Sequence, residues 1–521
     1  MFKKFLSHSE NILVLLIFLF SLLINQYYAN KGAFPIESFA HFDIAFRILQ
    51  GDIPFQDYWL VSGLLIDYMQ AFFFYLFGIN FQIYVLQASL INCLISISTF
   101  YLFKNFNLNI YLCFFYSISF ALLAYTTSGT LYVDHHASLL CLLVIYSLIL
   151  AIKTEKKKFL YLLPIILGLA FFTKAAPTVY IAFSVFLILI IYILKNRKYL
   201  WLKYIIYGSI FFLVLIFLFG YYQGIPILPF LEQYILFPPT IAEQRYGELN
   251  FTKGILLNYK FIYLVFLPIF FINLFNFFKL KNYYKKNDFY YFISLLLLII
   301  SLVFHQINTL NQEFIFFLIP VLCAFSHIYL NVYKVKLNKY LNVSLILISF
   351  FVTAKYHIRF NEERRFHEMS NINFELAQDA KIIDKKLSGL NWITPIFKTN
   401  PMNEINLIKE AVIILKNDQR KKMVLTNYSF ISSILEENLN SPSRWYIPNG
   451  AAYPLENNKF FNIYKNFMVN LIKKNSVEVV YIIRPVNKEE VYRYINENCF
   501  DENEITLILK ELNLKKCDDV Y

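Results

Sequence analysis

Acidic side chains gather in one polar stretch of an otherwise apolar chain, between about Tyr28 and Leu60. Carboxylates can accept a proton from a reacting hydroxyl group, so this stretch is a candidate for general-base chemistry. Apolar residues have helical spacing over 38–49, and Gly51 ends the pattern, which places acids on both flanks of a short helix. A solvated loop with incidental acids is the competing interpretation. The titratable residues of this stretch that we single out are Glu37, His41, Asp43, Asp52 and Asp57.

A second polar group interrupts an apolar region at Asp134, His135 and His136. Aspartate is a favoured N-cap residue, so Asp134 can simply begin the helix that follows. An Asp-His-His cluster can also bind a metal ion, although it supplies ligands from one place only. Capping and a functional role are compatible, and both interpretations stay open.

Two cations lie next to apolar sequence and suit phosphate recognition. Lys174 ends the apolar run GLAFFTKAAP, and an ionisable residue at such a position is a functional candidate by default. A lysine that snorkels to the membrane surface is the simpler alternative. Arg245, in PPTIAEQRYGEL, carries a guanidinium group, which binds phosphate well. We find no phosphate-binding glycine loop, no Ser-His-Asp signature and no cysteine-rich zinc spacing.

Long apolar helices must position these residues. Hydrophobic residues make up 58% of the 521 residues and charged residues only 16%, which excludes an ordinary soluble protein. A spanning helix needs about 20 mostly apolar residues. The stretch 64–78 is short and carries Asp67 and Gln70, so we place it at the membrane interface. Eleven runs qualify or nearly do: 11–27, 82–103, 109–125, 137–152, 159–173, 178–194, 204–222, 259–278, 289–304, 313–331 and 340–354.

The distribution of positive charge predicts the orientation. The net charge is +13, and Lys and Arg cluster in alternate loops such as 153–158, 195–203 and 279–286. This is a topology signal and not a nucleic-acid footprint, so we expect no nucleic-acid partner. With the N-terminus in the cytoplasm, an odd number of spans places the tail outside. We therefore predict a membrane domain over 1–354 and an extracytoplasmic domain over 355–521.

The tail has the pattern of a small α/β domain. Met423–Thr426, Trp445–Ile447 and Val477–Ile483 are predicted strands, and Asn458–Lys474 and Lys488–Asn496 are predicted helices. Cys499 and Cys517 are predicted to form a disulfide in an oxidising compartment, with helical sequence between them. The other cysteines lie in apolar runs and are predicted to be buried packing residues: Cys93, Cys113, Cys141 and Cys323.

The order of several short motifs resembles one family of membrane enzymes, the GT-C glycosyltransferases. The likeness is to bacterial members of the protein-mannosyltransferase and aminoarabinose-transferase type, and it covers about residues 10–350. It rests on the residues Glu37, Arg47-Ile48-Leu49-x-Gly51-x-x-Pro54-Phe55-x-Asp57, Tyr75-Leu76-Phe77-Gly78, Val133-Asp134-His135 and Gly168-Leu169-Ala170-Phe171-Phe172-Thr173-Lys174. The family usually has Asp at the position of Glu37, often followed by a second acid, whereas Ser38 follows here.

The resemblance implies an enzyme in a bacterial inner membrane. It would take a sugar from a polyprenyl-phosphate donor and transfer it to a lipid, glycan or protein acceptor on the outer face. Glu37 matches the position of the catalytic base, Asp57 is its competitor, and Asp134 borders the same site in the second external loop. His135, Lys174 and Arg245 would bind substrate. No cofactor is certain, and a divalent metal ion is left open.

Two other classes of protein fit parts of the pattern. A lipid or sugar transporter or flippase without transferase activity would also have many helices and buried charges. It would be expected to show paired half-chain repeats or helices interrupted at mid-membrane depth, and the sequence shows neither. A structural or sensory membrane protein would need no convergence of Glu37, Asp134 and Lys174 on one cavity.

Overall fold

The computed structural model describes residues 2–125, 128–241, 256–309, 314–447 and 449–517. The chain packs as two compact units. Unit 1 comprises Met1–Tyr28, Ala88–Leu218 and Asn250–Phe366, and unit 2 comprises Ala29–Gln87, Phe219–Leu249 and His367–Tyr521. Each unit is therefore built from alternating chain segments, and not from one block before and one block after residue 354.

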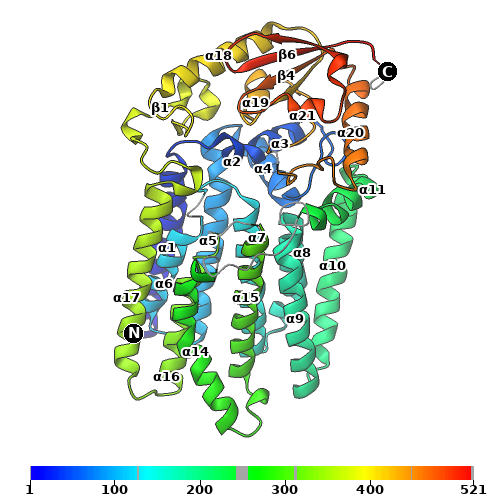
Figure 1. Cartoon of the computed structure of the whole chain (residues 1–521). Coiled ribbons are helices and arrows are strands. Elements are labelled where there is room, and N and C mark those ends of the chain that lie inside the picture. Colours follow the sequence, from blue (N-terminus) through cyan, green and yellow to red (C-terminus); the bar gives the residue numbers. More distant parts are fainter. Residues whose placement is uncertain (1, 126–127, 242–255, 310–313, 448, 518–521) are drawn as a thin grey trace. The chain divides into compact units, whose positions relative to one another are not determined.

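Long helices make up unit 1 (Figure 1). Within the described residues, eight helices of the chain are long and apolar enough to cross a membrane, which makes this an integral membrane protein by length and composition. Each of the eleven predicted runs contains a helix of the described residues. The helices are α1 (Phe2–Ala29), α5 (Phe81–Asn105), α6 (Ile110–Leu123), α7 (Val133–Thr154), α8 (Lys157–Thr173), α9 (Ala175–Asn196), α10 (Leu200–Tyr222), α14 (Lys260–Lys279), α15 (Asn287–Thr309), α16 (Leu318–Val332) and α17 (Asn338–Tyr356).

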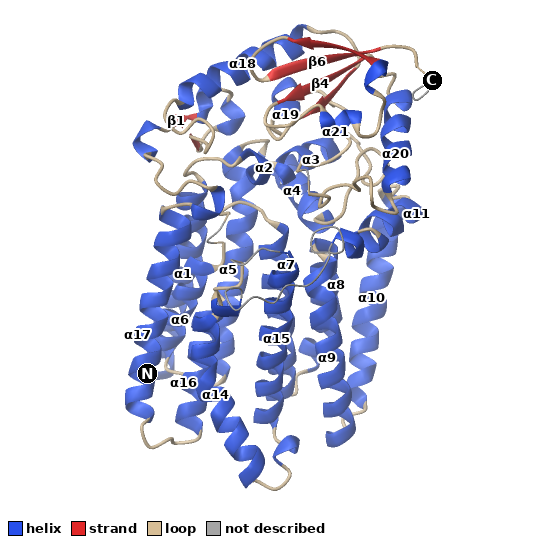
Figure 2. Cartoon of the chain, in the orientation of Figure 1, coloured by secondary structure: helices blue, strands red, loops and turns tan. Residues whose placement is uncertain are grey.

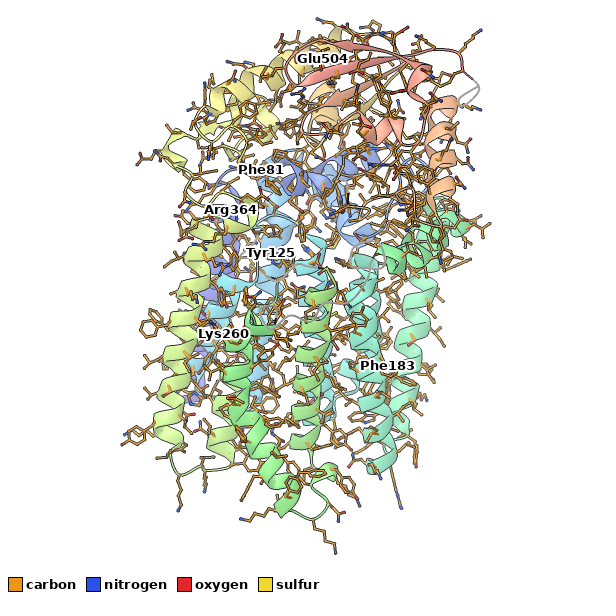
Figure 3. The ribbon with its side chains drawn as sticks, in the orientation of Figure 1. Phe81, Tyr125, Phe183, Lys260, Arg364 and Glu504 are labelled. Carbon is orange, nitrogen blue, oxygen red and sulfur yellow. A yellow bond between two sulfur atoms is a disulfide. The ribbon has the colours of Figure 1, made fainter. Side chains whose placement is uncertain are left out.

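Three of these helices, α6, α8 and α16, have 14, 17 and 15 residues and are shorter than the other eight. Helix α7 lies at the centre of unit 1 and packs against α8, α9 and α15. Helix α10 approaches α8 closely at Gly208, where an added Cβ would lie 2.2 Å from the Tyr161 carbonyl oxygen. Small residues permit such close helix packing in membranes. Apolar side chains that face outward, such as Phe183, suit contact with lipid (Figure 3).

All strands of the described residues belong to unit 2 (Figure 2). The four-stranded sheet has the order β3-β4-β6-β5, with β3 parallel to β4 and the other two pairs antiparallel. Strand β4 is a fully buried run of β-branched and aromatic residues, as expected for a central strand. A smaller antiparallel pair joins β1 and β2. The strands are β1 (Gln378–Asp379), β2 (Asn391–Trp392), β3 (Lys422–Leu425), β4 (Val479–Ile483), β5 (Phe500–Glu504) and β6 (Leu509–Leu514).

The segment 29–87 is an integral part of unit 2. Gly32 and Ala33 donate backbone hydrogen bonds to the carbonyls of Asn391 and Ile393. Trp59 joins the same buried core as strands β3, β4 and β6. The helices of unit 2 are α2 (Pro35–Ser38), α3 (Ala40–Leu49), α4 (Leu64–Phe77), α11 (Ile227–Phe230), α18 (Pro401–Asn417), α19 (Ile431–Leu435), α20 (Phe461–Lys474) and α21 (Glu489–Tyr492), with a π-helix at Leu231–Leu236.

Two predictions for the tail are wrong. Trp445–Ile447 is not a strand. The Asn427 side chain accepts a hydrogen bond from the Tyr446 amide at 3.0 Å and donates one to the Tyr446 carbonyl at 3.2 Å. The backbone polar groups of Tyr446 are therefore paired without a neighbouring strand. The sequence between the last two cysteines is not helical, because β5 and β6 form an antiparallel pair there and β6 also pairs with β4.

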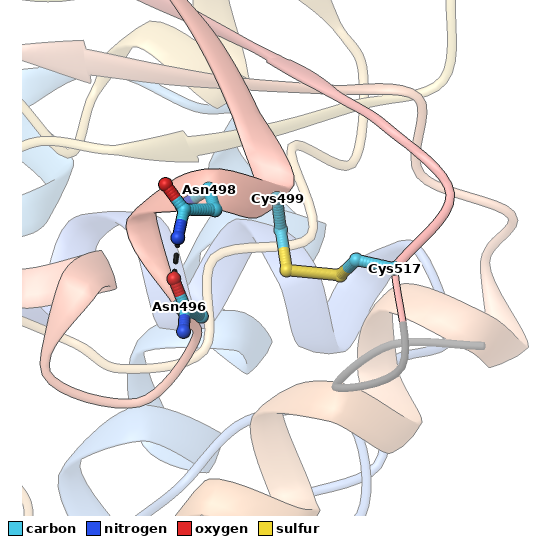
Figure 4. The surroundings of a disulfide bond; sticks show 4 residues. All are labelled: Asn496, Asn498, Cys499 and Cys517. Carbon is cyan, nitrogen blue, oxygen red and sulfur yellow. Dashed lines mark hydrogen bonds between the residues drawn. A yellow bond between two sulfur atoms is a disulfide. The ribbon is translucent and has the colours of Figure 1, made fainter.

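The predicted disulfide between Cys499 and Cys517 is present (Figure 4). Their Cα atoms are 5.5 Å apart, within the usual range for a disulfide. Beside it, the Asn496 side chain accepts a hydrogen bond from the Asn498 amide at 3.0 Å and begins the short turn that carries Cys499. The disulfide therefore links the residue before β5 to the segment that follows β6. The four other cysteines are buried and free, as predicted.

Candidate functional site

Three ionisable side chains meet inside unit 1. The Lys174 ammonium donates to both carboxylate oxygens of Asp134, at 2.9 and 2.8 Å. His305 Nε2 lies 2.7 Å from the same carboxylate and donates to it in the matching tautomer. Each side chain comes from a different place in the bundle: the first turn of α7, the junction of α8 and α9, and the last turns of α15. We call these three residues the Asp134 network.

A break between two helices positions Lys174. Helix α8 ends at Thr173, Lys174 has an extended backbone with φ −157° and ψ 123°, and α9 begins at Ala175. Pro177 lies in the first turn of α9, where a proline is tolerated. The Lys174 side chain therefore projects from the junction between two apolar helices.

Asp134 does not cap α7, contrary to the simpler interpretation. Tyr132 is the N-cap residue and makes no side-chain capping bond. Asp134 is the second residue of the helix, and its carboxylate turns to Lys174 and His305. A negative charge in the first turn is also favoured by the helix dipole. These contacts occupy the carboxylate, so the geometry favours Asp134 as a positioning residue for the lysine.

Exposure differs sharply within the Asp134 network. The side chains of Asp134 and His305 are 2% and 0% exposed, whereas Lys174 is 20% exposed. His305 Nδ1 is buried and has no hydrogen-bond partner among the described residues. The lysine is thus the member of the network whose side chain keeps some exposed surface, and Asp134 holds its ammonium in place.

His135, another predicted binding residue, directly follows Asp134 and has aromatic neighbours. His135 packs edge-on against Phe314, with ring centroids 4.7 Å apart, and its Nδ1 lies 3.3 Å from Ser128 Oγ. It therefore lies in a largely aromatic environment beside Ser128. Arg245 lies outside the described residues. Within the described residues, no group of three or more His, Cys, Asp or Glu side chains could hold a metal ion.

Glu37 and Asp57, the two candidate bases, lie in unit 2. Glu37 is half-buried in α2. Asp57 closes a tight turn, because its Oδ2 accepts a hydrogen bond from the Ile53 amide at 2.8 Å. Its Oδ1 lies 2.6 Å from the ammonium of Lys474 in α20. Asp57 therefore has a structural role within unit 2. Glu37 and Asp134 belong to different units, and their convergence on one cavity stays a prediction.

Three further aspartates of the N-terminal part of unit 2 also contact its C-terminal part. The Asp43 carboxylate accepts from the Ser432 hydroxyl, and Asp52 accepts from Asn438 at 2.6 Å. Asp67 lies 3.5 Å from the guanidinium of Arg444. With Asp57 and Lys474, four acids thus hold residues 43–67 to residues 432–474. Their shared role is to join two segments that are distant in sequence.

Burial around Arg444 changes the protonation of its neighbours. His41 Nδ1 lies 2.5 Å from Asp67 and 3.3 Å from Arg444, and desolvation lowers the pKa of His41 despite the nearby carboxylate. Burial raises the pKa of Asp43 to about 6, although the Arg47 charge opposes this shift. We call His41, Asp67 and Arg444 the Arg444 cluster. A cavity beside Arg444 and Asp43 measures only about 10 Å³, room for about one water molecule and not for a sugar.

Two members of these groups were not predicted, namely His305 and Arg444. His305 directly follows the predicted run 289–304 and lies in α15, and an ionisable residue in a membrane helix is itself a functional signal. Arg444 lies in a loop with no periodic pattern, and its partner Asp67 lies 377 positions earlier in the chain. No local pattern in the sequence connects them.

Comparison with known proteins adds no relative: no family model matches this chain, and no curated protein matches it.

Proposed function

We propose that this protein is a membrane glycosyltransferase that moves a sugar from a polyprenyl-phosphate carrier to an acceptor on the outer face of the membrane. The Asp134 network carries the proposal. It places one partly exposed lysine at the end of apolar helices, where the phosphate of a membrane-embedded donor lipid would lie. The motif order around Glu37, Asp57 and Lys174 supports the same function.

The chemistry requires two tasks of the protein. The acceptor hydroxyl attacks the anomeric carbon, its proton passes to a carboxylate, and the bond between that carbon and the carrier phosphate breaks with its electron pair leaving on phosphate oxygen. Glu37 is the proposed base. Lys174 stabilises the charge that develops on the departing phosphate, and Asp134 and His305 fix its position beforehand. Arg245 is a further proposed phosphate ligand.

The proposed location is a bacterial inner membrane, with the N-terminus in the cytoplasm and residues 355–521 outside. The uneven distribution of Lys and Arg among the loops supports this orientation. The disulfide between Cys499 and Cys517 supports it as well, since disulfides persist in oxidising compartments. A reporter that is active only in the cytoplasm should be silent when fused after Tyr521, and a strong signal would overturn the orientation.

The direct test is transfer of label from radiolabelled polyprenyl-phosphate sugars in membranes that contain the protein. The informative variant is the double substitution Asp134→Asn with Lys174→Gln, which removes both charges and leaves no buried charge unpaired. We expect transfer to fall steeply in this variant and to persist in Lys339→Gln, a control that removes one exposed lysine of α17. Undiminished transfer in the double variant would refute the role of the network.

A further inference from the structure

A second basic site lies elsewhere in unit 1, between the start of α14 and the end of α17. Its cavity measures about 140 Å³, more than ten times the volume beside Arg444. Three of its lining residues are cations and none is an acid. The lining residues are Leu257, Asn258, Lys260, Phe316, Lys355, Tyr356, Arg359 and Phe360. Lys260, labelled in Figure 3, is the first residue of α14.

The three cations of this cavity have no acidic partner among the residues that the structure describes. Lys260, Lys355 and Arg359 form no ion pair with a described residue. The acids that follow in the chain are paired elsewhere: Glu362 lies 3.4 Å from His357, and Glu363 lies 2.6 Å from Arg365. Like charges that converge without a counter-charge repel one another, so the site favours an anionic ligand.

One of these cations also has an unused donor inside the protein. Arg359 Nε is buried and has no hydrogen-bond partner in the described part of the chain. A buried donor without a partner costs about 1–3 kcal/mol, so an acceptor oxygen in the cavity would relieve it. Arginine is also suited to phosphate because its guanidinium presents several donors in one plane.

Aromatic rings form the wall of the cavity and hold the cations in place. Phe316 stacks on Tyr356 with centroids 3.8 Å apart and on Phe360 at 5.8 Å. The Arg359 guanidinium lies 5.2 Å from the Phe360 centroid. Lys260 and Lys355 lie 5.5 and 5.0 Å from the single ring of Phe261. Cation–π contacts of this kind position the charges but do not neutralise them.

The surroundings of the cavity are suited to acyl chains. Leu257 and Ile358, which adjoin the basic residues, are 61% and 52% exposed, and Phe351 on α17 is 63% exposed. Both helices are candidate membrane spans, and the cations stand where α14 begins and where α17 ends. Polar groups at the ends of spans lie at the level of the lipid headgroups. A free anion would gain nothing from the apolar rim.

We propose that this cavity binds the phosphate headgroup of an anionic membrane lipid, with the acyl chains lying along the exposed apolar side chains of α14 and α17. The site is separate from the Asp134 network in its residues and does not depend on the proposed transferase function. Lysines that merely snorkel would show no preference for one lipid and would need no cavity. The aromatic lining and the buried Arg359 donor therefore predict selectivity for a phosphate-bearing anionic lipid.

The test compares lipid retention by the full-length protein. The protein is reconstituted in nanodiscs that contain phosphatidylglycerol and phosphatidylcholine. It is then released from the nanodiscs into the gas phase, and native mass spectrometry counts the lipids that stay bound to it. The variant is Lys355→Gln with Arg359→Gln. The matched control is Lys336→Gln with Lys339→Gln, which removes two exposed charges around the other end of α17. Circular dichroism verifies that both variants keep their helices.

We expect the wild type and the control to retain phosphatidylglycerol over phosphatidylcholine, and the cavity variant to retain it at least about tenfold less, because two charge-assisted hydrogen bonds are lost. Equal retention by the wild type and the cavity variant would overturn the proposal, and so would an equal loss in the control. Displacement of phosphatidylglycerol by millimolar inorganic phosphate would assign the site to free phosphate. This result would also overturn the proposal that the cavity binds a lipid. None of these results depends on sugar transfer.

Discussion

The Asp134 network of unit 1 and the Arg444 cluster of unit 2 contain the same chemical parts: a carboxylate, a histidine and a cation. They differ in access. In the Arg444 cluster the side chains of Arg444 and Asp67 are 3% and 0% exposed, so every member is sealed inside the unit. In the Asp134 network the lysine is 20% exposed while its two partners are buried.

The partners also come from different kinds of segment. Arg444 lies in a loop, and its contacts with His41, Ser62 and Asp67 join that loop to residues far away in the sequence. Lys174, Asp134 and His305 all belong to the ends of apolar helices, which need no charge to pack. An ionic group that joins a loop to the distant helices α3 and α4 is explained by its contribution to stability. A charged group that costs free energy inside a membrane bundle requires another explanation, and ligand binding supplies one.

The largest expected effect on stability is at Arg444. Arg444→Met leaves Asp67 buried without a counter-charge, which should cost about 3–5 kcal/mol and expose unit 2 to protease. Thermal unfolding monitored by intrinsic fluorescence measures the loss. Adding Asp67→Asn to the same chain removes the stranded charge and should restore most of the stability. Failure of that rescue would mean that the cluster does more than join segments.

Asp43 should make unit 2 dependent on pH. Its folded pKa of about 6 lies above the ordinary value of 3.8, so the folded state keeps a proton that the unfolded state has lost between these values. Stability from this group is therefore full below about pH 4 and falls as the pH rises to 6, by about 3 kcal/mol in total.

Asp43→Asn keeps an acceptor for Ser432 and removes the titration. Melting temperatures recorded from pH 4 to pH 7.5 should fall less steeply in this variant than in the wild type. Parallel curves for the two proteins would contradict the burial argument. Asp501→Asn, at an exposed acid of β5, is the matched control.

Single substitutions of Lys174 and Asp134 in the Asp134 network should have different effects on binding of the donor lipid. Lys174→Gln should weaken binding of the donor lipid by about tenfold or more, since a hydrogen bond to a charged group contributes about 1.5–3 kcal/mol. Asp134→Asn leaves the ammonium and should retain binding. Donor affinity is measured by titration of the lipid in detergent. If Asp134→Asn abolishes binding in a folded protein while Lys174→Gln does not, the assignment of the two roles is reversed.

The smallest effect is expected at the ion pair between Asp57 and Lys474. The lysine is half exposed and the pair is therefore screened by water, so Lys474→Gln should destabilise unit 2 by less than about 1 kcal/mol. Chemical denaturation resolves a change of this size. A loss of several kcal/mol would mean that the ion pair of Asp57 stabilises unit 2 as strongly as a buried pair does. The contrast between exposed and buried charged groups would then not hold.

Helices and strands with a clear hydrophobic pattern were predictable from the sequence. All eleven apolar runs contain a helix of the described residues, and strands β3 and β4 occur within one to two residues of their predicted positions. Gly51, predicted to end a helix, follows α3 with φ +96°. Strand β5 was missed because four of its five residues are polar and exposed, so it has neither alternation nor an apolar run. Only pairing with β6 makes it a strand.

Two of the three residues of the Asp134 network were predictable from the sequence, but their contacts were not. Asp134 and Lys174 stand out because charge is rare in membrane spans. That they bind each other, 40 residues apart, follows from the packing of α7 on α8 and α9, which no local pattern encodes. Asp57 fits the motif as well as Glu37 does, and only the turn to Ile53 and the pair with Lys474 distinguish it.

The most direct test of the central claim is the rate of sugar transfer from a radiolabelled polyprenyl-phosphate donor by the wild type, Glu37→Gln and Asp57→Asn. Our account predicts transfer by the wild type, a loss of about 10²–10⁴-fold in Glu37→Gln with donor binding intact, and less than about tenfold loss in Asp57→Asn. Normal transfer by Glu37→Gln with a dead Asp57→Asn would identify the other acid as the base. Normal transfer by both variants would contradict the proposed carboxylate mechanism, and no transfer by the wild type would contradict the proposed function.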